Sequence, residues 1–510
     1  MPEEWSGECI CQRMPYIASA AIPAHHNPAM DAPVAVRISE VISALSYALD
    51  LTEGRPMGHS VRSCILAMRL AEEIGMDVND RGDLFYASLL KDAGCSSNSS
   101  KLFHILAADE IRAKRDVKLT DWTRVGWESL QFAITHVAVG APFLERVRTL
   151  VRVAAKQQVE SCELAKIRCE RGALVAQRLG FSPAVSDAIH SLDEHWNGGG
   201  YPDGLRGKNI PLFARIMNLA QTLEVFLVNR GPEAAVDAAR KRSGRWFDPQ
   251  LVRAVLSLHK RQALWNGLEK EHSIDDALAL EPEQRRMLAG EDTIEAICQT
   301  FAEIIDAKSP FTFRHSNGVA DAAVSISREL CLAEPDVTFI RRAALLHDIG
   351  KLSVSNSILE KPAALNADEW TTVKRHPYYT YHLLRRVPGF EVMSDTAAAH
   401  HEKLDGSGYF RSWTAEKMTL PMRILVVADI YDALAAKRPY RDAMPVEKVF
   451  EIMQKDAPKA LDGQCMEALK TAMLRPSLAD SGLINLSRSL GSSNTPLQVE
   501  ENRETLVSNN

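Results

Sequence analysis

The chain has 510 residues, 46% of them apolar, which is enough for two to four domains that each bury a core. Its net charge of -6 and pI near 6.2 give no electrostatic footprint for duplex DNA or an anionic membrane, so an anionic ligand needs a local basic cluster. There is no run of about 18 apolar residues, and the N-terminus lacks the basic start of a secretory signal, so we expect a cytoplasmic protein.

In chain order, the first segment is residues 1–34, which is rich in Pro and Ala and is expected to be disordered. Residues 35–262 and 291–475 are predicted to be helical, because apolar residues recur at helical spacing and bounded strand-like alternation is hard to find. Residues 263–290 are charged and helix-compatible, which predicts a helical connector, and the Ser- and Asn-rich tail 476–510 is expected to be disordered. The predicted fold is all-α, with two tandem helical-bundle domains.

The two helical segments are copies of each other. Residues 197–202 resemble residues 405–410, and the interval of 32 residues from His59 to Lys91 recurs from His315 to His347. The first copy is longer, since 76 residues separate Asp92 from Arg168 whereas 28 separate Asp348 from His376. The 48 extra residues, which contain Trp122 and Trp127, are predicted to form added helices.

The second copy contains a set of histidines and carboxylates of the kind that bind first-row transition metals. The candidate ligands are His315, His347, Asp348, His376, His400, His401 and Asp429. Successive helical residues point about 100° apart, so the adjacent pairs His347/Asp348 and His400/His401 suit two ions better than one. Two ions about 3.5 to 4 Å apart can activate water and clamp a phosphate, so the set indicates phosphodiester hydrolysis.

Two neighbouring side chains have less certain roles at this point. Asp432 shares a helical face with Asp429 and is either a ligand or a carboxylate that orients one. Ser316 directly follows His315 and is better suited to capping a helix than to touching metal.

This combination resembles the HD-GYP branch of the HD phosphohydrolase superfamily, over about 185 residues of the second copy and in weakened form over most of the first. Members are all-helical cyclic di-GMP phosphodiesterases with two or three iron or manganese ions. The resemblance implies that the seven candidates are metal ligands, with Asp348 bridging, and that Lys351 contacts the scissile phosphate. It also implies that substrate is bound by Asp405, Gly408, Tyr409, Arg438 and Arg441.

The chain departs from the family pattern at two places in the second copy. Some members hold a third metal through a Glu four residues before the first histidine, but Phe311 stands there, so two divalent ions are expected, iron or manganese first and nickel or zinc next. After Tyr409 the chain reads Phe410, Arg411, Ser412 and Trp413, where the family has Pro and a short Gly-Leu turn. This second departure lies in the loop implicated in substrate choice.

The first copy keeps His59 and Asp92 but has lost the rest of the pattern. The remaining ligand positions and the motif lysine are occupied by Lys91, Arg168, Leu192, Asp193, Gln221 and Cys95. Permanent positive charge repels a cation, so we predict no catalytic metal there. The glycine-rich loop at residues 198–205 is retained, either as a regulatory nucleotide or partner site or, as we favour, as a scaffold.

The sequence therefore predicts a tandem HD-GYP protein that hydrolyses a cyclic dinucleotide, cyclic di-GMP first, to linear pGpG or GMP. Two alternatives stay open: a phosphohydrolase for another cyclic or linear nucleotide, and a signalling module that binds nucleotide or a partner without turnover. A signalling protein docked on the GYP-like loops and a second copy of the chain are the partners this interpretation allows, and duplex nucleic acid and membranes are not expected.

Overall fold

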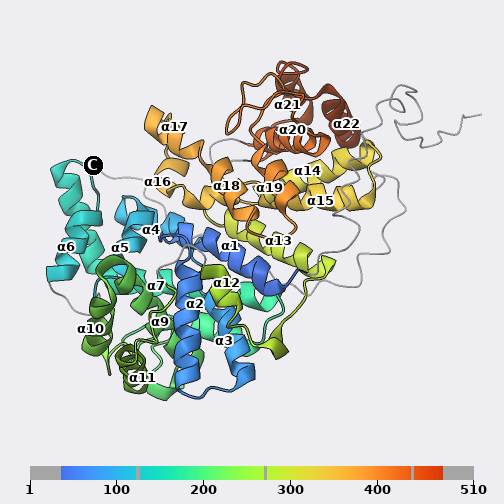
Figure 1. Cartoon of the computed structure of the whole chain (residues 1–510). Coiled ribbons are helices and arrows are strands. Elements are labelled where there is room, and N and C mark those ends of the chain that lie inside the picture. Colours follow the sequence, from blue (N-terminus) through green and yellow to red (C-terminus); the bar gives the residue numbers. More distant parts are fainter. Residues whose placement is uncertain (1–35, 122–126, 269–272, 438–441, 475–510) are drawn as a thin grey trace, which may run out of the picture.

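The computed structural model describes residues 36–121, 127–268, 273–437 and 442–474 (Figure 1). Every regular element in these ranges is a helix, with only isolated β-bridges outside the helices, so the all-α prediction is confirmed. The terminal segments that were expected to be disordered lie outside the described residues. No helix in the described ranges is both long enough and apolar enough to cross a bilayer.

The first copy forms the lower half of the molecule in Figure 1. Its helices are α1 (Ile38–Thr52), α2 (His59–Glu73), α3 (Val78–Leu90), α4 (Ser99–Leu106), α5 (Glu110–Val117), α6 (Trp127–His136), α7 (Phe143–Arg178), α8 (Pro183–His190), η3 (Gly207–Asn209), α9 (Leu212–Arg230), α10 (Pro232–Arg242) and α11 (Pro249–Lys260).

The second copy forms the upper half. Its helices are α13 (Glu291–Asp306), α14 (His315–Glu329), α15 (Glu334–Leu346), η5 (Ile349–Ser353), α16 (Asn356–Leu359), α17 (Ala367–Val373), α18 (His376–Leu384), α19 (Glu391–Ala398), α20 (Leu420–Ala435), α21 (Val446–Met453) and α22 (Gly463–Leu474).

The connector is only partly helical, which corrects the sequence prediction. Its described part contains α12 (Ser273–Leu278) and the short 3-10 helix η4 (Glu283–Arg285). Beyond η4 the backbone is extended and bonds to the start of the first copy, where Ile38 N donates to Met287 O and Ala289 N donates to Val36 O. The end of this charged segment is therefore an extended strand-like stretch, residues 287–289, that lies against the start of α1.

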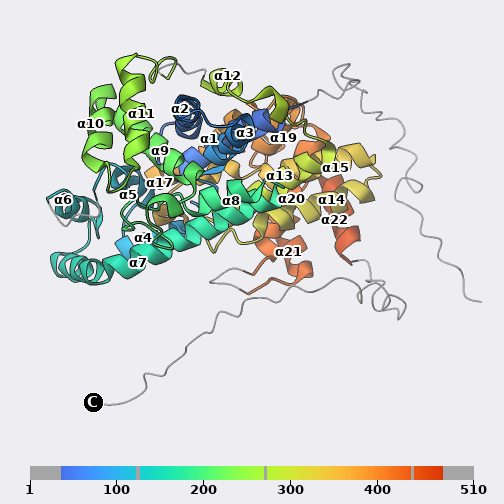
Figure 2. The ribbon, with the colours of Figure 1, turned by 90° about the horizontal axis from the view of Figure 1, so that it is seen from below.

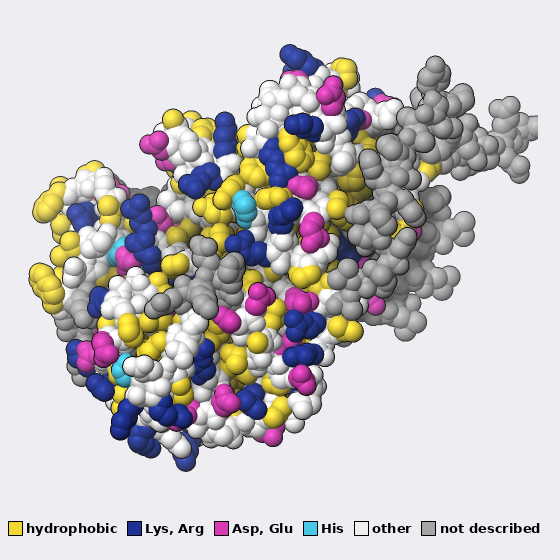
Figure 3. Space-filling view, viewed as in Figure 1, with side chains coloured by type: hydrophobic (Ala, Val, Ile, Leu, Met, Phe, Trp, Pro, Cys, Tyr) yellow, Lys and Arg dark blue, Asp and Glu magenta, His cyan; other side chains and the backbone are white. Residues whose placement is uncertain are grey.

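The described extra residues of the first copy form helices joined by short turns. They form α4, α5, α6 and the first part of α7, whereas Trp122 lies outside the described residues. The outer side of this insertion is apolar: Trp127 on α6 is 75% exposed and Phe143 on α7 is 79% exposed. Hydrophobic side chains are accordingly visible at the surface over α6 in Figure 3.

The two copies are packed against each other over a continuous apolar core. Helix α1 of the first copy contacts η5 and α18 of the second, with the Arg386 guanidinium 5.0 Å from the ring centre of Tyr47. Figure 2 shows α7 running as one long helix towards the second copy, where Arg171 and Arg178 pair with Glu303 of α13. The interface therefore involves elements that carry both metal-site positions and their first-copy counterparts.

Candidate metal centre and its degenerate copy

A buried carboxylate fixes the start of each first-histidine helix. In the second copy, Ser316 N and Oγ donate to Asp306 Oδ1 over 3.2 and 2.7 Å, and the first copy repeats the arrangement with Ser60 and Asp50 over 3.0 and 2.7 Å. The contact explains why Ser316 does not face the centre. Sequence analysis missed Asp306, although an Asp stands ten residues before this Ser in both copies.

Gly350 brings the HD segment against α18. A Cβ atom at this position would lie 2.0 Å from the carbonyl oxygen of His376, so only glycine permits this approach. Gly350 N donates to Thr380 Oγ1 over 3.1 Å, and Thr380 Oγ1 donates to His347 O over 2.8 Å. These contacts place His347 and Asp348, at the end of α15, beside His376 at the start of α18.

All seven candidate ligands lie in one cluster, which is buried except for the half-buried His401. Asp348 is central: its Oδ2 is 3.2 Å from His347 Nε2 and 3.6 Å from His315 Nε2, and its Oδ1 is 3.4 Å from His376 Nε2. On the other sides, His400 Nε2 lies 3.6 Å from Asp348 Oδ1, and Asp429 on α20 lies 3.2 Å from His315 Nε2. His401 is the outermost, with Nδ1 3.9 Å from Asp429 Oδ2.

Three of the histidines are held by the same backbone contact. The Nδ1 atoms of His347, His376 and His400 lie 2.7, 2.7 and 2.6 Å from the carbonyl oxygens of Ala344, Val373 and Ala397, each three residues earlier. Because a carbonyl only accepts, each Nδ1 carries a proton, and in the neutral form of each ring the Nε2 lone pair faces the centre. This is the tautomer that binds a metal.

The Nε2 atoms of His376 and His400 face each other, and their separation tests whether the cluster suits a bound cation. His376 Nε2 and His400 Nε2 are 2.9 Å apart, and both are acceptors once Nδ1 is protonated. His347 Nε2 and Asp348 Oδ1 are buried and have no hydrogen-bond partner among the described residues. Converging lone pairs and an orphaned carboxylate oxygen are stable around a positive ion, so the donor set fits divalent metals.

The electrostatics keep His376, His400, His401 and Asp348 in their ligating forms. Burial lowers the pKa of His376 and His401 well below the usual value and that of His400 to about 4, so the three imidazoles are neutral near pH 7. Burial alone would raise the pKa of Asp348, but the neighbouring His347 and Lys351 lower it well below its usual range. Three of the imidazoles are therefore neutral beside an ionised Asp348.

Asp432 orients a histidine and faces away from the centre. Its Oδ2 lies 2.6 Å from His315 Nδ1, which leaves His315 Nε2 facing Asp429 and Asp348. Although burial opposes it, the hydrogen bonds to Asp429 and Asp432 raise the pKa of His315 to about 9. Of the two roles that the sequence left open for Asp432, the geometry supports the orienting one.

Only some of the predicted substrate-binding residues lie at the cluster of candidate ligands. Lys351 pairs with Asp348, and the Tyr409 ring stacks on His401 with centres 4.6 Å apart, so both lie at the centre. Asp405 is exposed and accepts from Ser407 N and Oγ, which places it in the loop and outside the cluster. Gly408 lies against the backbone of Glu402. Arg438 and Arg441 lie outside the described residues.

Glu402 holds the loop that follows the double histidine. Its Oε1 accepts from Arg411 N over 2.7 Å, and its Oε2 accepts from Trp413 N over 2.9 Å. In the first copy Glu194 Oε1 accepts from Asp203 N and Gly204 N over 2.7 and 3.0 Å. Sequence analysis assigned Glu402 no role, but its recurrence in both copies was a usable signal.

In the first copy, ion pairs occupy the place of the metal site. Lys91 pairs with Asp92, Arg168 pairs with Asp193, and Lys118 Nζ lies 3.6 Å from Asp92 Oδ1. Asp92 persists within these pairs, and the first histidine keeps a carboxylate partner, with His59 Nδ1 against Glu224. Glu53, Asp92 and Cys95 come close enough together to suggest a ligand group, but the lysines already neutralise both carboxylates.

Comparisons with known proteins agree with this geometry. The profile of the HD domain family matches residues 151–251 and 299–465. The chain belongs to the HD domain family. It is 41% identical over 436 residues to 3'3'-cGAMP-specific phosphodiesterase 3 of Vibrio cholerae, covering 86% of this chain and 94% of that protein.

A further relative and a solved structure extend the comparison. The cyclic di-GMP phosphodiesterase response regulator RpfG of Xanthomonas campestris is 33% identical over 199 residues, or 38% of this chain and 52% of that protein. The crystal structure of the V. cholerae phosphodiesterase V-cGAP3 superposes with a TM-score of 0.61 at 37% identity, covering 86% of this chain and 99% of that one. The resemblance to the HD phosphohydrolase superfamily is confirmed.

Proposed function

We propose that the second copy is a metal-dependent phosphodiesterase for a 3′3′-linked cyclic dinucleotide. The observation that carries the proposal is the convergence of three Nδ1-protonated histidines, which present lone pairs to one another beside Asp348. The relatives named as cyclic dinucleotide phosphodiesterases support the reaction class.

Two divalent ions would be held by His315, His347, Asp348, His376, His400, His401 and Asp429, and when bound they supply the Lewis acidity that activates water and neutralises the phosphate. Asp348 offers one oxygen to each side of the cluster, which suits a bridging ligand. Lys351 is 19% exposed and directed at Asp348, so its ammonium stabilises the charge that develops on the attacked phosphate.

A cleft of about 420 Å³ opens beside the double histidine and is suited to a nucleotide. Its wall includes Trp370 and Tyr409, whose rings can stack on bases, and Lys374 and Lys403, whose ammonium groups attract phosphates. Lys374 Nζ lies 5.6 Å from the centre of the Tyr409 ring. Aromatic and cationic groups therefore line the approach to the metal ligands.

The first-choice substrate differs from the sequence expectation. The motifs favoured cyclic di-GMP, whereas the relative that shares 41% identity over 86% of the chain is named as specific for 3′3′-cyclic GMP-AMP. We therefore propose 3′3′-cyclic GMP-AMP as the preferred substrate and keep cyclic di-GMP as the second candidate. The departure at Phe410 lies in the loop next to Tyr409, as expected of a change in base preference.

The test combines metal analysis with turnover. Purified protein is expected to contain about two transition-metal ions per chain and to linearise 3′3′-cyclic GMP-AMP with a higher kcat/KM than cyclic di-GMP. His347→Ala should lose both metal and activity. The control is His382→Ala, which should keep both, because the His382 ring packs on Tyr378 outside the cluster. Full turnover by metal-free His347→Ala would refute the proposal, and a reversed kcat/KM ratio would refute the substrate preference alone.

A further inference from the structure

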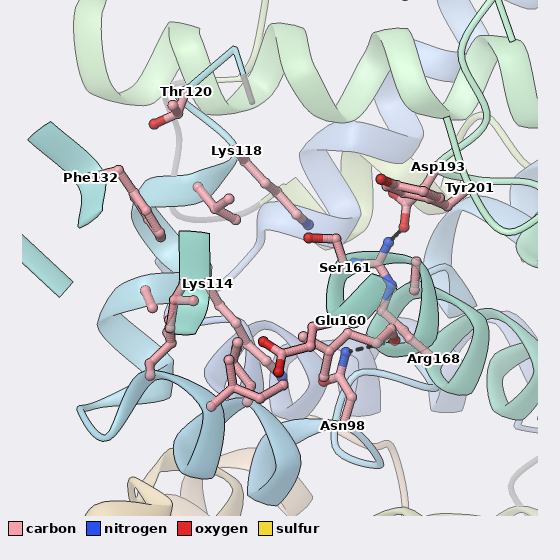
Figure 4. Close-up of a pocket in the computed structure, with 18 of the residues that line it drawn as sticks. Asn98, Lys114, Lys118, Thr120, Phe132, Glu160, Ser161, Arg168, Asp193 and Tyr201 are labelled. Carbon is pink, nitrogen blue, oxygen red and sulfur yellow. Dashed lines mark hydrogen bonds and ion pairs between the residues drawn. The ribbon is translucent and has the colours of Figure 1, made fainter. Parts of the chain in front are cut away.

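A cavity of about 460 Å³ lies in the first copy, beside the ion pairs that replace the metal site (Figure 4). Among its lining residues are the counterparts of four second-copy site positions: Arg168, Asp193, Tyr201 and Gln221. This volume is typical of pockets that bind small molecules. The degenerate centre therefore forms the inner end of a hollow that is large enough for a ligand.

The inserted helices give this cavity an apolar wall. Its apolar side chains include Leu106 of α4, Val117 of α5, Phe132 of α6, and Leu150 and Val153 of α7. Most of them belong to a small apolar cluster of the insertion that is separate from the main core. Each Å² of apolar ligand surface removed from water is worth roughly 25 cal/mol, so this apolar chamber favours a ligand with an apolar body.

The charged residues of the wall balance one another. Two ammonium groups share one buried carboxylate, with Lys118 Nζ 3.1 Å from Glu53 Oε2 and Lys114 Nζ 3.5 Å from Glu53 Oε1. His195 adds no charge near pH 7, because burial lowers its pKa to about 3. Among the described lining residues, three cations meet three carboxylates: Lys114, Lys118 and Arg168 against Glu53, Glu160 and Asp193. A ligand with a net charge would stay uncompensated in this wall, which is costly, so a neutral ligand is favoured.

Asn98 places an unpartnered acceptor at the wall of the cavity. The residue is 7% exposed, and its Nδ2 donates to Leu164 O over 3.2 Å (Figure 4). Because that carbonyl only accepts, the orientation of the amide is fixed and Oδ1 is the remaining acceptor. Oδ1 has no hydrogen-bond partner in the described part of the chain. A buried acceptor is ordinarily satisfied by protein, water or ligand, so this atom favours a ligand that carries a donor.

We propose that the first copy binds a neutral small molecule in this cavity, with an apolar body in the chamber and a hydrogen-bond donor directed at Asn98 Oδ1. The apolar wall, the balanced charges and the unpartnered acceptor each match one property of such a ligand. Its binding is independent of the phosphodiester chemistry proposed for the second copy.

The chemistry of the ligand is tested by titrating the full-length protein calorimetrically with indole and benzofuran. The two molecules have nearly the same shape and both are smaller than the cavity, but only indole has an N–H donor. We expect one indole per chain and an affinity about 3- to 10-fold higher than that of benzofuran, which is the contribution of one neutral hydrogen bond. Indole-3-acetate and tryptamine, which add a negative and a positive charge, should bind more weakly than indole. Absence of indole binding, equal binding of benzofuran, or tighter binding of either charged analogue would overturn the proposal.

Asn98→Leu tests the donor contact. Leucine has a similar volume and no acceptor, so the preference for indole over benzofuran should disappear while benzofuran still binds. The matched control is Asn79→Leu, at an exposed position that does not line the cavity, and it should keep the preference. An undiminished preference for indole in Asn98→Leu would show that the donor binds elsewhere and would refute the contact.

The location is tested independently of Asn98 with two adjacent alanines of α7. Ala154 lines the cavity, whereas Ala155 is exposed and does not line it. Ala154→Trp should reduce indole affinity at least about 10-fold by filling the mouth, and Ala155→Trp should leave it unchanged. The opposite ranking, or an equal effect of both, would place indole on the exposed outer face near Val151 and Val159 and refute the site. Because binding is measured without turnover, these outcomes are separable from failure of the proposed phosphodiesterase.

Discussion

Phe410 holds a backbone conformation that most side chains avoid. Its φ is 89°, and its ring lies 6.0 Å from both Tyr378 and Tyr381, which stabilises this otherwise strained position. The family proline cannot simply be restored here, because proline fixes φ near about −65°. The departure in sequence is therefore also a departure in loop conformation.

We predict that Phe410→Pro displaces the loop that follows Tyr409 and does not change the substrate preference from 3′3′-cyclic GMP-AMP to cyclic di-GMP. It should lower the free energy of unfolding by about 1 to 3 kcal/mol and raise KM for every cyclic dinucleotide, because the native φ becomes inaccessible. Phe410→Leu keeps the backbone and should change KM much less. Denaturant unfolding and a substrate panel measure both effects, and improved turnover of cyclic di-GMP by Phe410→Pro would contradict the prediction.

Lys351 permits a separation of charge stabilisation from metal binding. Lys351→Met should reduce kcat about 100-fold or more while metal content stays constant, because the ammonium acts on the phosphate and is not a ligand. Lys361→Met, which removes an ammonium that pairs with Glu369 away from the centre, is the control. Loss of metal from Lys351→Met would show that the lysine mainly supports Asp348.

At the scale of elements, the approach of α18 to the HD segment depends on one missing side chain. Gly350→Ala would place a Cβ 2.0 Å from His376 O, and Gly94→Ala in the first copy would meet Arg168 O at 1.9 Å. The close contact of helix and turn is thus a property of both copies. In the second copy, this contact brings His347, at the end of α15, close enough to His376, at the start of α18, for both to lie in one centre.

Gly350→Ala is accordingly predicted to destabilise the protein by more than about 2 kcal/mol and to lose metal, because backbone atoms must separate. Gly463→Ala is the matched control: it lies at the start of α22, where an added Cβ would meet no atom within 4 Å, and it should be neutral or slightly stabilising. Thermal unfolding and metal analysis distinguish the two, and equal stability of both variants would contradict the prediction.

The sequence predicted the helices, the duplication and the positions that converge on the centre, because periodicity and motif spacing are local signals. It did not predict the contacts that orient those residues. Asp306 and Glu402 accept from backbone amides 9 to 11 residues further along the chain, and only comparison of the two copies marks these carboxylates in the sequence. The chamber was missed for a related reason: apolar residues on inserted helices predict a packed core equally well.

At the scale of the whole molecule, α5 connects the first-copy cavity to the second copy. Glu110 at its start is fully buried and accepts from Ser355 Oγ over 2.7 Å and from Asn356 N over 2.9 Å, just beyond η5. Lys308 Nζ lies 3.6 Å from the same carboxylate. The helix that contributes Lys114 to the cavity therefore also contacts the segment that follows Lys351.

This interface should give a measurable pH dependence. Burial, partly offset by Glu110, lowers the pKa of Lys308 from 10.5 to about 8. Between these two pH values the unfolded chain keeps the proton that the folded chain has lost, so the free energy of unfolding should rise with pH, by up to roughly 3 kcal/mol. The rise should be absent below pH 8 and complete above pH 10.5.

Lys308→Met isolates this contribution, because it removes the titrating group and keeps a similar volume. The difference in unfolding free energy between the natural protein and Lys308→Met should increase in favour of the natural protein from pH 8 upward, as measured by urea unfolding at each pH. A difference that is constant with pH would show that Lys308 is not titrating in the interface.

The ion pairs of the first copy also make it hard to create there, by substitution, the ligand pattern of the second copy. Arg168→His alone would strand Asp193 without its partner and would still leave Lys91 and Leu192 where metal ligands stand in the second copy. Removing one member of this half-buried pair leaves the other charge without its partner, which destabilises the protein before any metal can bind. No single substitution therefore gives the first copy the seven-residue pattern of the second; five positions would have to change together, namely Lys91, Arg168, Leu192, Asp193 and Gln221.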